Sequence, residues 1–137
     1  MIVENFKETF QEMNAENVGI IQKIYDEKIT FEDPFHRVIG YENLETYFKR
    51  LYINVESINF EFHEEVANHD AVFLTWTMRL VHPKLNGGKE ISVNGASHLK
   101  IRGDKIVYHK DYFDGGAMLY EQVPIIGGLV RWIKKNL

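Results

Sequence analysis

The sequence has no cysteine and only three prolines among its 137 residues. Without thiols, the chain can form neither a disulfide framework nor a thiolate metal site. An excess of basic residues is also missing, because 16 Lys and Arg stand against 20 Asp and Glu, which gives a net charge of -4. Such a chain has no broad electrostatic attraction for phosphate backbones, so we expect no nucleic-acid partner.

A long apolar run is missing as well. The most apolar stretch, Val123–Ile133, is interrupted by Pro124, two glycines and Arg131, and it is far shorter than the ~20 residues that span a bilayer. The opening MIVENFKETF lacks the basic segment and continuous apolar run of a signal peptide. We therefore expect a cytoplasmic protein with no membrane partner.

The residues that are present indicate one globular domain over residues 1–137. The chain is 45% hydrophobic, 13% aromatic and 26% charged, a composition typical of folded rather than disordered proteins. Its length is close to the commonest size of a single domain. The aromatic share is large enough to line a cavity.

Apolar spacing predicts helices first and strands afterwards. Helical spacing covers about 2–13, 18–25 and 41–52, and a short alternating strand, Lys28–Asp33, ends at Pro34 between the second and third helices. The period then changes to two in four long segments, which begin near Ile58, Ala71, Lys89 and Lys105. Residues 117–137 are predicted to be helical in two pieces, with Pro124 at a first helical position.

This order predicts an α+β fold, in which N-terminal helices cover one face of a cone-shaped, strongly curved antiparallel sheet. A concave interior of that kind is a usual place for a small-molecule pocket. Apolar residues on both faces of the strand from Ala71 also predict a homodimer formed through the outer face of the sheet.

The element order and four short motifs resemble the nuclear transport factor 2-like superfamily, and within it the SnoaL-like group. The motifs are Met13-Asn14-Ala15, Glu32-Asp33-Pro34, Gly40 before the third helix, and Lys110-Asp111-Tyr112-Phe113-Asp114. Relatives in this superfamily include ketosteroid isomerases, polyketide cyclases and limonene epoxide hydrolases. The resemblance implies a scaffold that is used for several reactions and for plain binding.

The resemblance also implies roles for two aspartates. The isomerases use the aspartate of Glu-Asp-Pro as general base, which corresponds to Asp33, and the cyclases use a last-strand aspartate, which corresponds to Asp111. The oxyanion-binding positions of the isomerases fall at Thr9 and Ser97, and the hydrolase Arg and second Asp fall at Thr77 and Arg79. The cyclases are therefore the best functional match.

Each candidate side chain has two readings. An apolar neighbourhood would suit Asp111 to proton transfer, and Arg79 would then stabilise the negative charge that develops during the reaction. Alternatively, Asp111 and Arg79 form a structural ion pair. Asp33 could serve catalysis or accept backbone N–H groups in a turn. His36 would assist it at the pocket mouth or lie in a surface loop.

The expected pocket wall consists mainly of aromatic residues. Alternatively, these side chains are packed in the hydrophobic core. They are Tyr25, Phe31, Tyr47, Phe60, Phe62, Trp76, Ser97, His109 and Phe113. His98 and His109 lack the close ligand spacing of a metal site, so we expect no metal and no cofactor.

The C-terminal apolar helix either closes the cone or packs on a second subunit, although its pattern also occurs in helices that lie on membranes. Together these features favour a cofactor-independent isomerase, cyclase or hydrolase acting on a small apolar molecule. The alternative is a non-catalytic ligand-binding or protein-interaction module.

Overall fold

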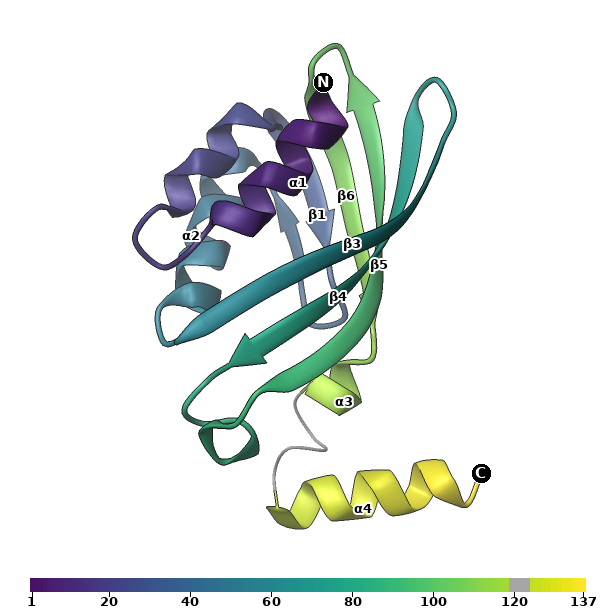
Figure 1. Cartoon of the computed structure of the whole chain (residues 1–137). Coiled ribbons are helices and arrows are strands. Elements are labelled where there is room, and N and C mark those ends of the chain that lie inside the picture. Colours follow the sequence, from purple (N-terminus) through teal and green to yellow (C-terminus); the bar gives the residue numbers. More distant parts are fainter. Residues whose placement is uncertain (119–123) are drawn as a thin grey trace.

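Helices and one six-stranded sheet make up the computed structural model, which describes residues 1–118 and 124–137 (Figure 1). The helical segments are α1 (Ile2–Glu12), the 3-10 helix η1 (Val18–Lys23), α2 (Tyr41–Tyr52), the 3-10 turn η2 (Asn86–Gly88), α3 (Gly115–Met118) and α4 (Pro124–Lys135). The strands are β1 (Tyr25–Glu32), β2 (Arg37–Ile39), β3 (Ser57–Ala67), β4 (Ala71–Val81), β5 (Ile91–Arg102) and β6 (Lys105–Phe113).

The strand order is β2-β1-β6-β5-β4-β3. The four long strands form the predicted antiparallel meander, joined by turns at 68–70 and at Gly103, whose φ of +62° suits glycine. The sheet is mostly antiparallel, as predicted, and β1 pairs with β6 in parallel. This pairing brings the chain around Asp33 next to the end of β6, which carries Asp111.

Three local predictions are corrected. The second helix is a 3-10 segment that ends at Lys23, so Tyr25 opens β1 instead of closing a helix. The short strand is longer than predicted, and Asp33 follows it directly. The third long strand begins at Ile91 rather than Lys89, and the three-residue β2 was not predicted.

The main core lies between the helices and the concave face of the sheet. α1 and α2 cover this face on one side of the molecule (Figure 1). Their apolar faces meet the inward side chains of the strands, including Phe6, Leu44, Phe48 and Leu74, all of which are buried. The helical spacing in α1 and α2 and the alternation in the strands thus each produce one apolar face, and these faces meet in the core, as an α+β fold requires.

A second apolar cluster continues along the concave face of β4 and β5. It contains Trp76, Met78, Leu80, Ile91 and Val93. Val55 and Leu85, which lie in loops, pack against this cluster from its edges. The inner face therefore stays apolar beyond the main core, where loops border it.

The outer face of the sheet is mostly polar but carries exposed apolar side chains. Phe73 is 47% exposed and Val66 67%, and these two residues are partners in the β3–β4 register. Phe73 stacks on His98 of the next strand, with a ring-centre distance of 4.3 Å. The homodimer through this face stays a prediction.

The C-terminal helix α4 lies beyond one end of the sheet (Figure 1). It begins at Pro124, as predicted. Leu129, Trp132 and Ile133 are exposed, so the expectation that this helix closes the cone is wrong for these side chains. The predicted helical span includes residues 119–123, which lie outside the described residues, as do the side chains of Ile125, Ile126 and Val130.

Candidate functional site

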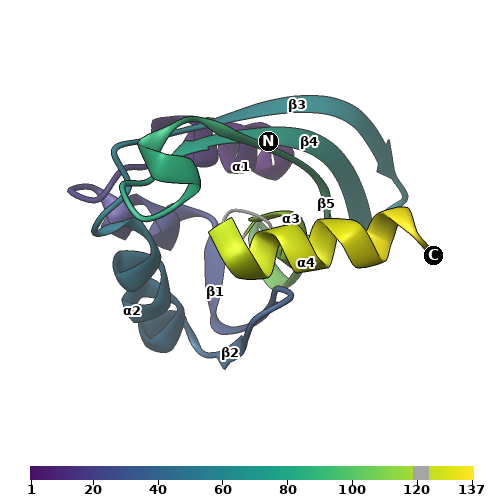
Figure 2. The ribbon, with the colours of Figure 1, turned by 90° about the horizontal axis from the view of Figure 1, so that it is seen from below.

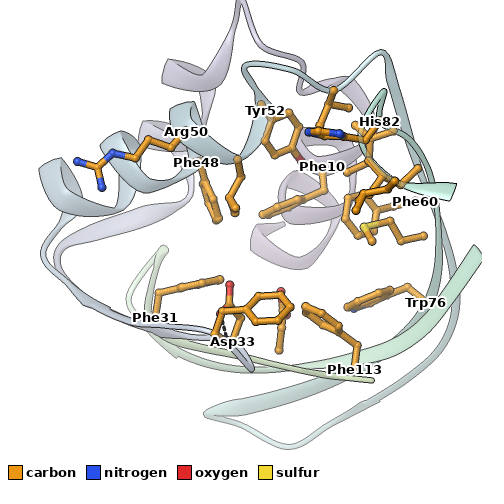
Figure 3. A pocket seen from close by; sticks show the side chains of 18 of the residues that line it. Phe10, Phe31, Asp33, Phe48, Arg50, Tyr52, Phe60, Trp76, His82 and Phe113 are labelled. Atoms are coloured by element: carbon orange, nitrogen blue, oxygen red, sulfur yellow. Dashed lines mark hydrogen bonds between the residues drawn. The ribbon is translucent and has the colours of Figure 1, made fainter. Parts of the chain in front are cut away.

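A cavity of about 410 Å³ opens between α2, the concave face of the sheet and the β4–β5 loop. Aromatic rings supply much of its wall, as the close view shows (Figure 3). These rings belong to Phe10, Phe31, Phe48, Phe60, Trp76 and Phe113. Ile58, Met78, Leu80 and Leu85 complete the apolar lining. A space of this size and character suits a compact apolar molecule.

Two carboxylates, Asp33 and Asp111, interrupt the apolar wall. Asp33 follows β1 and Asp111 lies on β6, so the parallel pairing of these strands places both at the same side of the cavity. In Figure 3, Asp33 lies beside Phe31 on the wall opposite Phe48.

One oxygen of Asp111 is held by two side chains from its inner side. Ser97 on β5 donates its hydroxyl to Asp111 Oδ1 at 2.6 Å, and His109 Nε2 lies 2.6 Å from the same oxygen. Trp76 Nε1 in turn donates to Ser97 Oγ at 2.9 Å. Ser97 and Asp111 are register partners on β5 and β6, so backbone pairing sets this contact.

His109 is buried and connects Asp111 to Tyr25. Because a carboxylate oxygen only accepts, Nε2 donates its N–H to Asp111, and Nδ1 lies 2.7 Å from the Tyr25 hydroxyl oxygen in a second hydrogen bond. Burial, followed by the nearby charge of Asp111, raises the pKa of Tyr25 well above its usual value. The phenol therefore keeps its proton and orients the imidazole.

Asp111 lines the cavity, and its second oxygen is left open. Among the described residues no hydrogen bond reaches Oδ2, and no buried side-chain oxygen or nitrogen is left without a partner. Oδ2 is therefore solvent-accessible, on a side chain that is only 18% exposed. One oxygen is fixed by donors and the other is open, which is an arrangement that can present a carboxylate to a bound molecule.

Asp33 is held more completely than Asp111. Its Oδ1 accepts the backbone N–H groups of Phe35 and His36 at 2.8 and 2.9 Å, which is the turn predicted as its alternative role. Its Oδ2 accepts the Tyr47 hydroxyl at 2.5 Å. Burial and this carboxylate raise the pKa of Tyr47 well above its ordinary value. Tyr47 therefore stays a donor that orients Asp33 toward the cavity.

The structure brings together most of the predicted wall, in two layers. Phe31, Phe60, Trp76 and Phe113 line the cavity directly. Tyr25, Ser97 and His109 lie behind Asp111 in its hydrogen-bond network. Phe62 borders a small separate recess together with Ser97 and His109, and Tyr47 contacts the cavity only through Asp33.

Two predicted site residues lie elsewhere. Arg79 points to the outer face of β4 and pairs with Glu61 of β3 at 2.9 Å, so it neither holds charge in the cavity nor pairs with Asp111. His36 is exposed and contacts the edge of the Tyr47 ring, with ring centres 5.3 Å apart. It is therefore a loop histidine beside the Asp33–Tyr47 pair rather than a lining residue.

The cavity also has residues that were not predicted. Tyr52 lines it from the end of α2, and Arg50, His82 and Lys84 border it. His82 Nδ1 accepts the backbone N–H of Lys84 at 3.0 Å, which fixes its ring in the loop after β4. Strand alternation could have found His82, because it continues the inward even-numbered series of β4.

Groups of three or more side chains able to hold a metal ion do not occur among the described residues. None of the described helices is long and apolar enough to cross a membrane.

The chain belongs to the family of the SnoaL-like domain, whose sequence profile matches residues 6–109. No curated protein matches the sequence. The matched segment includes Asp33 and ends two residues before Asp111.

Solved structures share the fold at low sequence identity. A protein of ketosteroid isomerase-like fold from Catenulispora acidiphila DSM 44928, in complex with trimethylamine, is 16% identical, with a TM-score of 0.76 over 88% of this chain and 91% of that one. An LEH-like epoxide hydrolase from M. tuberculosis is 21% identical, with a TM-score of 0.70 over 95% and 92%.

A protein described as a SnoaL-like polyketide cyclase from Jannaschia sp. CCS1 is 12% identical, with a TM-score of 0.70 over 82% of this chain and 85% of that one. Because these proteins differ in the activities that their descriptions name, the likeness defines the fold, and the reaction has to be argued from the site.

Proposed function

We propose that the protein binds a compact apolar molecule in the cavity and transfers a proton on it without a cofactor, as an isomerase, cyclase or hydrolase would. Asp111 is the general base and acid of this proposal. The observation that carries it is the asymmetry of the Asp111 carboxylate, whose Oδ1 is held by Ser97 and His109 and whose Oδ2 is left open, on a residue that lines the apolar cavity.

The surrounding residues support proton transfer at this oxygen. A base works best when its geometry is fixed before the substrate arrives, and two hydrogen bonds to Oδ1 fix the rotation of the carboxyl group. Ser97 and His109 are positioning residues here, and Tyr25 and Trp76 orient them in turn. Both oxygens of Asp33 already accept hydrogen bonds. In this proposal, Asp33 therefore orients the bound molecule at the cavity wall and does not transfer the proton.

The proposed step is removal of a proton from an acidic carbon of the bound molecule. The C–H bond breaks, the proton forms a bond to Oδ2 of Asp111, and the electron pair moves into an adjacent carbonyl to give an enolate. In a ketone with a β,γ double bond the enolate is a dienolate, and return of the proton to its γ-carbon moves the double bond to the α,β position and completes an isomerisation. Asp111 is restored at the end, so no further reactant is consumed.

A binding module without turnover is the second candidate. Its support is the contact between His109 and Asp111, which gives the carboxylate a buried partner and therefore a structural reason to be there. In that case the cavity would hold its ligand through apolar contact alone.

A generic carbon acid separates the two candidates. 2-Tetralone is a compact, mostly apolar ketone, and NMR in D₂O follows the replacement of its α-protons by deuterium. We expect the wild-type protein to accelerate this exchange and Asp111→Asn to reduce the acceleration by about 100-fold or more. Asp104→Asn, in the exposed β5–β6 turn, is the matched control and should keep the wild-type rate.

Equal exchange by wild type and Asp111→Asn would remove Asp111 as the base. If 2-tetralone binds but exchanges no faster than in buffer, the binding module replaces the enzyme. Circular dichroism of each variant verifies that the fold is kept.

A further inference from the structure

The helix α4 turns large apolar side chains away from the rest of the protein. Leu129 is 59% exposed, Trp132 62% and Ile133 44%. Side chains of this size on an amphipathic helix normally pack against their own domain. Here they form a patch that the described part of the chain does not cover.

Sequence spacing separates an apolar and a basic face on α4. Leu129, Trp132 and Ile133 follow the i, i+3, i+4 spacing of one helix face. Arg131, Lys134 and Lys135 repeat the same spacing two residues later, which places them on the opposite side. We refer to Leu129, Trp132 and Ile133 as the apolar patch of α4.

The orientation of the helix is fixed in part by an ion pair. Lys134 donates to Asp114, which follows β6. This contact joins the C-terminal half of α4 to the segment that follows β6, while Leu129, Trp132 and Ile133 stay exposed.

α4 lies at the end of the molecule where the cavity opens. In Figure 1, it lies below the β4–β5 loop and α3, and in Figure 2, seen from below, it crosses in front of α3. Arg50 and Lys84, which border the cavity, are exposed at this end. The net charge of the chain is nevertheless negative.

We propose that α4 binds the surface of a bilayer that contains anionic lipids, with the apolar patch inserted among the headgroups and the basic side chains close to the phosphates. The segment 124–137 holds three of the 16 basic residues of the chain and none of the 20 acidic ones. An amphipathic helix with Trp and Leu on one side and Lys and Arg on the other is typical of interfacial binding. Electrostatic attraction to anionic lipid adds to the apolar contribution.

A second copy of the chain is a poorer match for this patch. A helix of 12 residues is about 18 Å long, and one face of it offers roughly 200 Å² at a width of about 10 Å. A stable protein interface buries about 800 Å² on each partner. A lipid surface has no such threshold, because it surrounds whatever area is inserted.

Vesicle flotation tests the proposal with the intact protein. The wild-type protein should float with vesicles of phosphatidylcholine that contain about one third phosphatidylglycerol. With vesicles of pure phosphatidylcholine, the floating fraction of the protein should be at least about tenfold lower. The double variant Leu129→Ser/Trp132→Ser should lose at least about tenfold in bound fraction. Ile39→Ser removes an apolar side chain of comparable exposure, 56%, from the edge strand β2 and is the matched control.

Two further readouts distinguish the outcomes. Trp132 fluorescence should shift to the blue on vesicle binding, a change that Trp132→Phe abolishes, while the buried Trp76 contributes a constant background. Lys135→Glu should weaken binding at low salt. The proposal is overturned if the wild type does not float with the anionic vesicles, or if the double variant floats as well as the wild type. In either case, a dimer in sedimentation that Trp132→Ser dissociates would identify a second copy of the chain as the partner of the patch.

Discussion

Gly95 occupies a place in β5 where even a methyl group would not fit. It is the register partner of Trp76 on β4 and of Phe113 on β6. A Cβ atom at this position would lie 2.3 Å from Trp76 Cη2 and 2.7 Å from both Cζ2 and Cζ3. The indole ring lies against the Gly95 backbone, and this contact directs its Nε1 to Ser97.

The Gly95→Ala substitution therefore sets two effects against each other. Alanine in a strand interior gains about 0.5–1 kcal/mol over glycine from backbone entropy. Forcing the buried Trp76 ring to move costs typically 1–3 kcal/mol or more. Because contacts below 3 Å fall on three ring atoms at once, we expect the second effect to dominate and the variant to be destabilised by roughly 1–2 kcal/mol.

Urea unfolding followed by circular dichroism measures this loss. Combining Gly95→Ala with Trp76→Leu provides the internal control, because the smaller side chain removes the ring atoms that the new methyl group would meet. In that background, Gly95→Ala should cost less than about 0.5 kcal/mol. Equal losses in both backgrounds, or a Gly95→Ala protein as stable as the wild type, would refute the steric argument.

Three more predictions concern other parts of the molecule. Tyr47→Phe removes the hydroxyl that Asp33 accepts and should lower the unfolding free energy by about 1–3 kcal/mol in urea titrations, whereas a loss below 0.5 kcal/mol would show that the contact is incidental. Burial raises the pKa of Tyr25 and Tyr52 above the ordinary 10.0. The folded state therefore keeps protons that the unfolded state releases at high pH, so the stability should be constant below about pH 9 and fall above pH 10. A stability that rises at pH 11 in thermal scans would contradict this. Phe73→Ser on the outer sheet face should shift the expected dimer toward monomer in analytical ultracentrifugation, and a wild-type protein that is already monomeric at micromolar concentration would remove the dimer prediction.

Elements with strong local signals were predicted closely. The spacing of Leu44, Tyr47, Phe48 and Leu51 gave α2 its observed bounds, Tyr41–Tyr52, and the strand after Gly103 matches β6 at both ends. In each case, the periodicity of the segment agrees with its burial in the fold. The pairing of β1 with β6 could not be predicted from periodicity, because alternation shows which face is buried and not which strand is the neighbour.

The candidate site was only partly predictable, for the same reason. Alternation correctly placed Asp111 on the inner face with His109 and Phe113, but the contact with Ser97 depends on the β5–β6 register. The error at Arg79 was avoidable, since odd-numbered residues of β4 such as Phe73 and Val81 point outward. No local signal distinguishes the side chains that border the cavity from those one layer behind it, because both groups are apolar or aromatic and lie on the same face.

A crystal structure with bound 2-naphthol tests the central claim most directly, because this compound has the shape of the enol of 2-tetralone. The account predicts the naphthol rings inside the cavity between Phe60, Trp76 and Phe113, with C1, which corresponds to the α-carbon of 2-tetralone, about 3–3.5 Å from Asp111 Oδ2 and with Oδ1 still held by Ser97 and His109. A cavity filled by protein side chains, or an Asp111 carboxylate with both oxygens turned away from the bound compound, would contradict it.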